Sequence, residues 1–237
     1  MLAAFFVESA RPEAFHGGMK KLLTALIITA TAAFAQAQDW ANFGKYEKAN
    51  GEIKNPPAAV FMGDSITEGW VGQRRDFFEK NNFAARGISG QVTSQMLVRF
   101  RADVLNLKPK CVVILAGTND IARNQGVISV ENIFGNIVSM CELARFHKIK
   151  PVICSVLPAH EYKWRKEIES VEPIRRLNGM LKDYAAKNNI AYADFYSAML
   201  DERNGLPEKY SPDGVHPNPE GFKVMEPIVL KAIKSAK

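Results

Sequence analysis

Three short segments of this 237-residue chain carry side chains that together could do acyl-transfer chemistry. Gly63-Asp64-Ser65 offers a serine hydroxyl directly after an apolar run, and Gly117-Thr118-Asn119-Asp120 offers a side-chain amide after another. Near the C-terminus, Asp213-Gly214-Val215-His216 places a carboxylate three residues before an imidazole. A serine nucleophile, an amide donor for an oxyanion, a base and an acid that orients the base are the parts that ester hydrolysis requires.

Ser65 has two interpretations. Gly63 permits a tight turn from a strand into a helix, so Ser65 is expected near a helix start, where backbone N–H groups lack intrahelical partners. This position suits a nucleophile whose own N–H faces the oxyanion, and it equally suits a serine that only caps the helix. The segment is not G-x-S-x-G, so the sharp elbow of the α/β-hydrolase fold is not predicted.

His216 is the predicted base. It lies in the loop 211–217, which two prolines stiffen, and Asp213 is within reach of one ring nitrogen. The other ring nitrogen is then available to take the Ser65 proton. The alternative is a surface turn in which an aspartate and a histidine meet by chance.

The spacing of apolar residues predicts the elements that must position these groups. Short apolar runs, which suit parallel strands covered on both faces, occur at 58–62, 83–85, 111–116, 151–156 and 190–194. Helical spacing predicts helices over about 129–147 and 172–188, and Asn218-Pro219 is a helix start. The alternation predicts an α/β fold, a three-layer α/β/α sandwich around a five-stranded parallel sheet.

In such sheets, ligands bind beyond the carboxyl ends of the strands. Ser65, Gly90, Asn119 and His160 each follow one of the first four predicted strands, so folding is expected to gather them at one edge. Gly90 is either a turn glycine with positive φ or a glycine whose N–H faces substrate, and it can be both. Asn119 is predicted to donate to an oxyanion rather than only to tie a loop, whereas Asp120 is predicted to brace that loop.

The candidate substrate contacts around these groups are Asp64, Arg86, His160 and Trp164. Trp164 could stack on a sugar or pack an acyl group, or it could be buried against a neighbouring loop. Arg86 could orient a substrate or only pair with an acid.

The chain resembles the SGNH (GDSL) hydrolase superfamily over residues about 58–222. The resemblance is carried by four ordered blocks: Gly63-Asp64-Ser65, Arg86-Gly87-Ile88-Ser89-Gly90, Gly117-Thr118-Asn119-Asp120 and Asp213-Gly214-Val215-His216. It implies a flavodoxin-like sandwich and Gly90 as an N–H donor. Within the superfamily, the chain looks most like secreted bacterial acylhydrolases related to platelet-activating-factor acetylhydrolase and to carbohydrate acetylesterases.

These observations predict a serine esterase that cleaves short-chain esters, mainly acetyl esters, of a small molecule or a glycan; the glycan is what the family resemblance implies. Ser65, Asp213 and His216 are the expected catalytic residues, and Ser65, Gly90 and Asn119 the expected oxyanion donors. No metal or organic cofactor is expected. The blocks are compactly spaced, without an apolar insertion for a lid, which favours a short acyl group. The alternatives are a lysophospholipase or thioesterase, and a non-catalytic carbohydrate-binding protein.

Composition limits the partners. The chain has 31 Lys and Arg against 25 Asp and Glu, and the basic residues are interspersed with acidic ones, which argues against a nucleic-acid-binding surface. The three cysteines lack the spacing of a metal site, and their odd number favours buried thiols over disulfides.

The N-terminal part is expected to be removed. Met19-Lys20-Lys21 is followed by an uncharged run, 22–34, and by small residues suited to cleavage, which is typical of a signal peptide over 19–37. The run is shorter than the roughly 20 residues of a membrane span. We therefore expect residues 1–18 to be an upstream extension and 38–237 to be a single hydrolase domain. The mature protein is expected to be exported, periplasmic or extracellular, without a stable membrane anchor. Residues 39–57 are predicted to hold a short helix packed on the domain.

Overall fold

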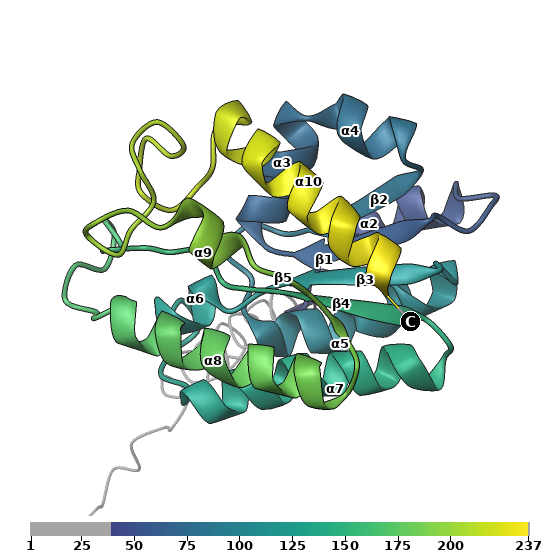
Figure 1. Cartoon of the computed structure of the whole chain (residues 1–237). Coiled ribbons are helices and arrows are strands. Elements are labelled where there is room, and N and C mark those ends of the chain that lie inside the picture. The colour runs from purple at the N-terminus through teal and green to yellow at the C-terminus, as the bar shows by residue number, and fades with distance from the viewer. Residues whose placement is uncertain (1–38, 237) are drawn as a thin grey trace, which may run out of the picture. The chain divides into compact units, whose positions relative to one another are not determined.

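Five strands form one sheet in which every pair of neighbours is parallel (Figure 1). The computed structural model describes residues 39–236. The strands are β1 (Ala59–Gly63), β2 (Phe83–Gly87), β3 (Cys111–Leu115), β4 (Lys150–Cys154) and β5 (Ala191–Ala193). Their order, β2-β1-β3-β4-β5, is the flavodoxin-like order. The predicted sandwich is confirmed, with strand ends displaced by one or two residues.

Helices cover both faces of this sheet (Figure 1). One face packs, through a single apolar cluster, against α3 (Ser65–Gln73), α4 (Arg75–Lys80), α9 (Phe195–Met199) and α10 (Pro219–Ser235). The other face packs against α5 (Thr93–Asp103), α7 (Val130–Phe146) and α8 (Val171–Lys187). The short elements are α2 (Gly44–Gly51), the 3₁₀ turn η1 (Leu105–Leu107) and α6 (Thr118–Ile121).

Strand residues alternate between the two apolar clusters. In β1, Val60 and Met62 join the cluster beneath α5, α7 and α8, whereas Phe61 joins the one beneath α3 and α10. Every residue of β1 and of β3 is buried. This explains why these strands read as continuous apolar runs, because a parallel sheet covered on both faces has no solvent side.

Aromatic packing ties α3 to α10. The Trp70 ring of α3 is fully buried and stacks against Phe77, with ring centroids 5.7 Å apart, and against Phe222 of α10, with centroids 5.4 Å apart. The contact between Trp70 and Phe222 joins the helix that starts at Ser65 to the helix that follows His216. The large buried area of such rings makes this packing a major source of order between the two chain segments.

The predicted helix starts are observed. Asn218 caps α10, since its Oδ1 accepts the Gly221 N–H at 3.0 Å and Pro219 is the first helical residue. The helix predicted within 39–57 is α2, which contacts the sheet through a hydrogen bond from the Tyr46 hydroxyl to the Gly87 carbonyl. Phe43, directly before α2, is 43% exposed.

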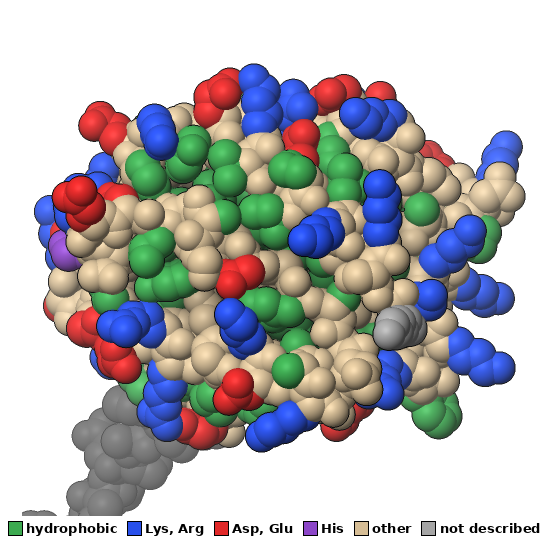
Figure 2. Space-filling model, viewed as in Figure 1, with side chains coloured by type: hydrophobic (Ala, Val, Ile, Leu, Met, Phe, Trp, Pro, Cys, Tyr) green, Lys and Arg blue, Asp and Glu red, His purple; other side chains and the backbone are tan. Residues whose placement is uncertain are grey.

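Several composition-based predictions can be compared with the described residues. All three cysteines are buried free thiols, as predicted. Within residues 39–236, no cluster of His, Cys, Asp and Glu could hold a metal ion, and no helix has the length and apolarity needed to span a bilayer. On the face shown in Figure 2, basic and acidic side chains are largely interspersed. The predicted extension 1–18 and signal peptide 19–37 lie outside the described residues.

Candidate active site

Two glycines let α3 begin directly on the ends of β1 and β2. Gly63 and Gly87 are register partners. A Cβ on Gly63 would lie 2.2 Å from Thr67 Oγ1, and one on Gly87 would lie 2.4 Å from the Glu68 nitrogen. Side chains at these two positions would therefore push the first turn of the helix away. The close approach fixes Ser65, the first residue of α3, at the carboxyl edge of the sheet.

Three side chains from the two ends of the described chain form a hydrogen-bonded line. The Ser65 Oγ lies 2.9 Å from His216 Nε2, although the two residues are 151 positions apart. The other ring nitrogen, Nδ1, lies 2.7 Å from Asp213 Oδ2. These distances are short enough for proton transfer from the hydroxyl to the ring and for the carboxylate to orient the ring.

The Asp213 carboxylate is held by its own loop. Its Oδ1 accepts hydrogen bonds from Ser211 Oγ at 3.0 Å, from the Val215 N–H at 2.9 Å and from the His216 N–H at 2.8 Å. Partial burial acts to raise the pKa of Asp213, but the hydrogen bonds from the His216 backbone and ring, Val215 and Ser211 outweigh it and hold the pKa well below its ordinary value. Asp213 is therefore ionised, which favours a proton on His216 Nδ1 and leaves Nε2 to accept from Ser65.

Asn119 is the second residue of α6, which follows β3 closely and which the chain enters through Gly117 with φ +122°. Its Nδ2 donates to the Gln91 carbonyl at 3.0 Å, and its Oδ1 accepts from Asn124 Nδ2 at 2.8 Å. The network therefore orients the amide nitrogen toward the loop that contains Gly90. The Gln91 carbonyl occupies one of the two hydrogens on Nδ2.

The Gly90 loop follows β2. Gly90 has φ +78°, as expected for a turn glycine, and no atom lies within 4 Å of the place where its Cβ would be. The preceding residue, Ser89, is fixed by Glu68 of α3, whose carboxylate accepts from the Ser89 N–H at 2.8 Å and from its hydroxyl at 2.7 Å. Glu68 also pairs with Lys45 at 2.8 Å. The helix that carries Ser65 thus also holds the Gly90 loop.

Asp120 braces the loop after β3, as predicted. It is buried, and its carboxylate accepts from the Thr93 N–H at 2.9 Å and from the Thr93 hydroxyl at 2.6 Å. These bonds join the loop after β3 to the first residue of α5. Burial raises the pKa of Asp120 to about 6, although its hydrogen bonds to Thr93 oppose the shift.

Asp64 was a candidate substrate contact, and the structure corrects this prediction. The side chain is 2% exposed and caps α3, because its Oδ1 accepts the Ile66 N–H at 2.9 Å. Burial raises the pKa of Asp64 to about 6, with the Ile66 hydrogen bond and the nearby His216 opposing the shift. Asp64 therefore starts the helix behind Ser65 and does not face a ligand.

The Asp64→Asn variant is expected to be more stable than the wild type at about pH 8, with a difference that narrows as the pH falls. Asparagine keeps the helix cap but removes a buried charge. Since the pKa of Asp64 is raised from 3.8 to about 6 in the folded state, the folded wild type binds more protons between these values, and its stability falls as the pH rises through them. The rise in the pKa of Asp64 from 3.8 to about 6 corresponds to about 3 kcal/mol of stability. Thermal unfolding at a series of pH values measures the difference, and a gap that does not change with pH would contradict the assignment.

Arg86 was also a candidate substrate contact, and the structure corrects this prediction as well. The side chain is buried, and its Nε donates to Asn50 Oδ1 at 2.7 Å while Nη1 donates to the Ala85 carbonyl at 2.8 Å. Its guanidinium lies 4.9 Å from the centre of the Tyr46 ring. Arg86 thus fastens α2 to the sheet, and its Nε and Nη1 groups donate to protein acceptors.

Trp164 is half-exposed beside the predicted base. Its ring centroid lies 6.3 Å from that of His216, and its Nε1 donates to Asn124 Oδ1 at 3.3 Å. Since Asn124 in turn binds Asn119, one network links this exposed indole to the predicted oxyanion donor. Of the two interpretations, the buried one is wrong, because 44% of Trp164 is exposed.

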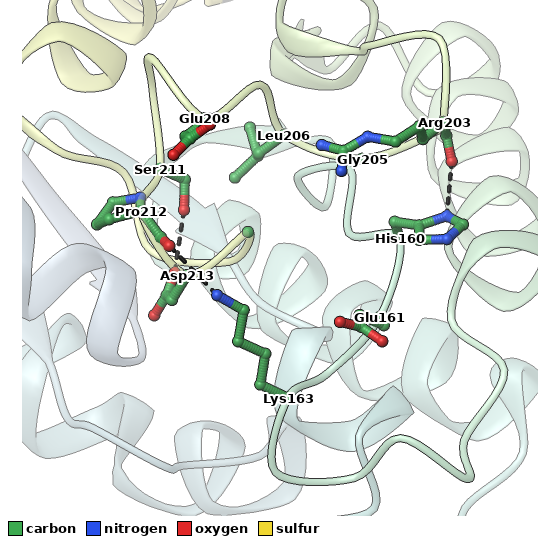
Figure 3. A pocket seen from close by; sticks show the side chains of 11 residues that line it. His160, Glu161, Lys163, Arg203, Gly205, Leu206, Glu208, Ser211, Pro212 and Asp213 are labelled. Carbon is green, nitrogen blue, oxygen red and sulfur yellow. Dashed lines mark hydrogen bonds between the residues drawn. The ribbon is translucent and has the colours of Figure 1, made fainter.

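His160 lies on a neighbouring pocket instead of beside Ser65. Its Nδ1 is 2.7 Å from the Arg203 carbonyl, on a loop that also packs closely against it at Gly205 (Figure 3). The pocket has a volume of about 210 Å³ and lies between the segment 160–163 and the segment 203–214. Lys163 bridges the two segments by donating to the Pro212 carbonyl at 3.3 Å. One wall is the Asp213 loop, so this polar pocket adjoins the site from the side of the acid.

Reasoning from the sequence did not single out four residues that hold the site: Glu68, Gln91, Arg99 and Asn124. Of these, only Arg99 could have been noticed in the sequence. Asp103 follows it by four positions on a helix, and oppositely charged residues at this spacing pair on one face. The other three act through contacts with loops distant in sequence, and no local pattern marks them.

Comparison with known proteins agrees with this geometry. The model of the GDSL-like Lipase/Acylhydrolase family matches residues 61–224. A Bacteroides thetaiotaomicron structure described as a GDSL-like lipase is 45% identical, covers 83% of this chain and 98% of its own, and has a TM-score of 0.80. A Bacteroides fragilis structure assigned as an acylhydrolase is 46% identical over the same shares, with a TM-score of 0.81.

A more distant relative is the Bacillus subtilis lipoprotein YqeF, which is 26% identical over 206 residues that span 70% of this chain and 85% of that protein. Since the family model spans more than half of the sequence, and the two Bacteroides proteins match it over nearly their whole length, this chain belongs to the GDSL-like lipase/acylhydrolase family and is a serine ester hydrolase.

Proposed function

We propose that this hydrolase removes short acyl groups, acetyl groups above all, from an alcohol of carbohydrate type through an acyl-enzyme on Ser65. The observation that supports it most directly is the hydrogen-bonded line from Ser65 through His216 to Asp213. A serine in such a line can lose its proton to the ring as it attacks a carbonyl carbon.

The proposed mechanism has two stages. In the first, His216 Nε2 takes the Ser65 proton while Ser65 Oγ attacks, and the oxyanion accepts hydrogen bonds from the N–H groups of Ser65 and Gly90 and from Asn119 Nδ2. His216 then gives its proton to the leaving alcohol. In the second stage, His216 takes a proton from water as the water oxygen attacks the acyl carbon. It then returns this proton to Ser65 Oγ as the bond between the acyl carbon and Oγ breaks, which releases the acid and restores the Ser65 hydroxyl. Each step uses groups of this chain and water alone.

Two features of the site support an alcohol of carbohydrate type. The Trp164 ring stands half-exposed beside His216 and offers a flat apolar surface of the kind on which sugar rings stack. The adjoining pocket is lined by charged side chains of both signs, including Lys163, Glu161 and Glu208, which suit hydroxyl groups better than an alkyl chain. Export to the periplasm or the medium belongs to the same proposal, and a bacterial relative is a lipoprotein.

Asn119→Ala tests the proposed oxyanion donor. We expect kcat for p-nitrophenyl acetate to fall roughly 10²–10³-fold, because one preorganised donor is lost. Asn188→Ala is a matched control, since among residues 39–236 its side-chain amide donates to the Tyr184 carbonyl at the end of α8 and to no group of the active site. An Asn119→Ala enzyme with the kcat of the wild type would exclude this role.

The substrate class is tested by measuring the acid released from a series of esters. The series contains p-nitrophenyl esters from acetyl to palmitoyl, acetylated xylan, acetylated sialic acid and lysophospholipids. We expect the highest kcat/KM for acetyl esters and release of acetate from at least one acetylated glycan. Faster hydrolysis of lysophospholipids or palmitoyl esters would overturn the acetyl preference. A folded protein that hydrolyses none of them, and that a serine-directed organophosphonate fails to label, would instead be a binding protein.

A further inference from the structure

One fully buried arginine holds the strand ends beneath the active site. Arg99, on α5, has no exposed surface, and its guanidinium makes four hydrogen bonds. Three go to groups at or just after the ends of β1 and β2, and one goes to Asp103 on the same helix. Nη2 donates to the Gly63 carbonyl at 3.0 Å and to the Arg86 carbonyl at 2.9 Å. Nε donates to Gln91 Oε1 at 2.6 Å, and Nη1 donates to Asp103 Oδ2 at 2.8 Å.

Two of these acceptors, Gly63 and Gln91, are adjacent to the three proposed oxyanion donors. Gly63 ends β1 two residues before Ser65. Gln91 directly follows Gly90, and its carbonyl accepts the Asn119 amide at 3.0 Å. One rigid, planar group therefore contacts the residues that set the positions of all three donors, which lie on separate loops.

The charge of Arg99 is balanced where it lies. Asp103 is equally buried and pairs with it, and the second oxygen of Asp103 accepts from Asn50 Nδ2 at 2.7 Å. Burial lowers the pKa of Arg99, but the bond to Asp103 opposes this, and a guanidinium stays protonated in proteins. A buried pair of this kind adds little net stability over an apolar pair of the same size, so stability alone does not explain why a charged pair occupies this place.

We propose that Arg99 is a positioning residue for the oxyanion hole, an inference that rests on the proposed function. Its donors fix the end of β1 and the Gly90–Gln91 loop relative to each other. The Gln91 carbonyl in turn fixes the Asn119 amide through their hydrogen bond. A lysine ammonium cannot make the same set of hydrogen bonds. Its three donors are on a single nitrogen, whereas the guanidinium donors reach four acceptors that lie around its edge.

The test compares three variants with a matched control, using p-nitrophenyl acetate. Arg99→Lys keeps the charge, and Arg99→Met with Asp103→Leu removes the pair without leaving a buried charge alone. Gln91→Met keeps the arginine but breaks its link to the Gly90 loop, together with the hydrogen bond that Gln91 Nε2 donates to the Ala41 carbonyl at 2.7 Å. We expect kcat to fall about 10–100-fold in the Arg99 variants and about 5-fold or more in Gln91→Met, with KM changed less than about 3-fold, because small displacements of transition-state donors reduce rate rather than ground-state binding.

The control is Arg86→Met, which removes the other buried guanidinium on these strand ends, the one that contacts α2. We expect Arg86→Met to lose thermal stability to a similar extent but to keep the kcat of the wild type. Should both Arg99 variants fail to fold, Gln91→Met decides. The proposal would be overturned if the folded variants kept the kcat of the wild type, or if Arg86→Met lost as much kcat as they did. In either case, ester hydrolysis by the wild type and its labelling at Ser65 would leave the proposed function intact.

Discussion

Ser65→Ala is expected to reduce kcat for p-nitrophenyl acetate by about 10⁶-fold, the loss seen when a hydrolase of this type loses its serine. The reason is that no other hydroxyl shares the contact with His216 Nε2, at 2.9 Å, within the described part of the chain. The fold should be unaffected, since the cap of α3 is the Asp64 side chain rather than that of Ser65. Steady-state kinetics measure the loss of kcat, and the circular dichroism spectrum shows whether the fold is kept.

A serine-directed organophosphonate provides an independent readout for the same variant. Wild-type protein should gain the mass of one phosphonyl group, on the peptide that contains Ser65, and Ser65→Ala should gain none. Ser197→Ala is the control, since this serine on α9 only binds its own helix cap, Asp194. Labelling of Ser65→Ala, or residual activity above about 1% of the wild type, would show that the nucleophile lies elsewhere.

Asp213→Asn has the second largest expected effect, a loss of about 10⁴-fold in kcat. Three donors converge on Asp213 Oδ1, so the asparagine carbonyl oxygen should occupy that place. Its NH₂ group then faces His216 Nδ1, which must accept a hydrogen bond instead of donating one. The ring proton moves to Nε2, and Nε2 can no longer take the proton of Ser65.

Kinetics distinguish this tautomer effect from a loss of structure. KM and the unfolding temperature of Asp213→Asn should remain close to those of the wild type, because the loop keeps its three hydrogen bonds at Oδ1. Asp183→Asn, an exposed substitution on α8, controls for the change in net charge. Since the pKa of Asp213 is held well below its ordinary value, the loss should not be relieved at any pH from about 5 to 9. A variant that retains more than about a tenth of the wild-type kcat would contradict the orienting role.

The sequence alone determined the architecture and the residues worth testing. Five short apolar runs separated by amphipathic stretches allow few arrangements other than a covered parallel sheet, because a strand buried on both faces must be apolar throughout. The rule that ligands bind beyond the carboxyl ends of parallel strands then gave Ser65 and Asn119 one common edge. Glycine at 90 could be predicted to have positive φ, because only the backbone is involved.

Only the tertiary structure decided what each polar side chain at that edge contacts. Asp64 and Arg86 have the same chemical groups whether they face a substrate or the protein, and burial against α3 and α2 gave both of them internal partners. Arg99 became visible as a candidate positioning residue only when four acceptors from different segments converged on it. Hydrogen-bond partners of buried polar groups are set by long-range packing, so local sequence patterns name the groups but not their partners.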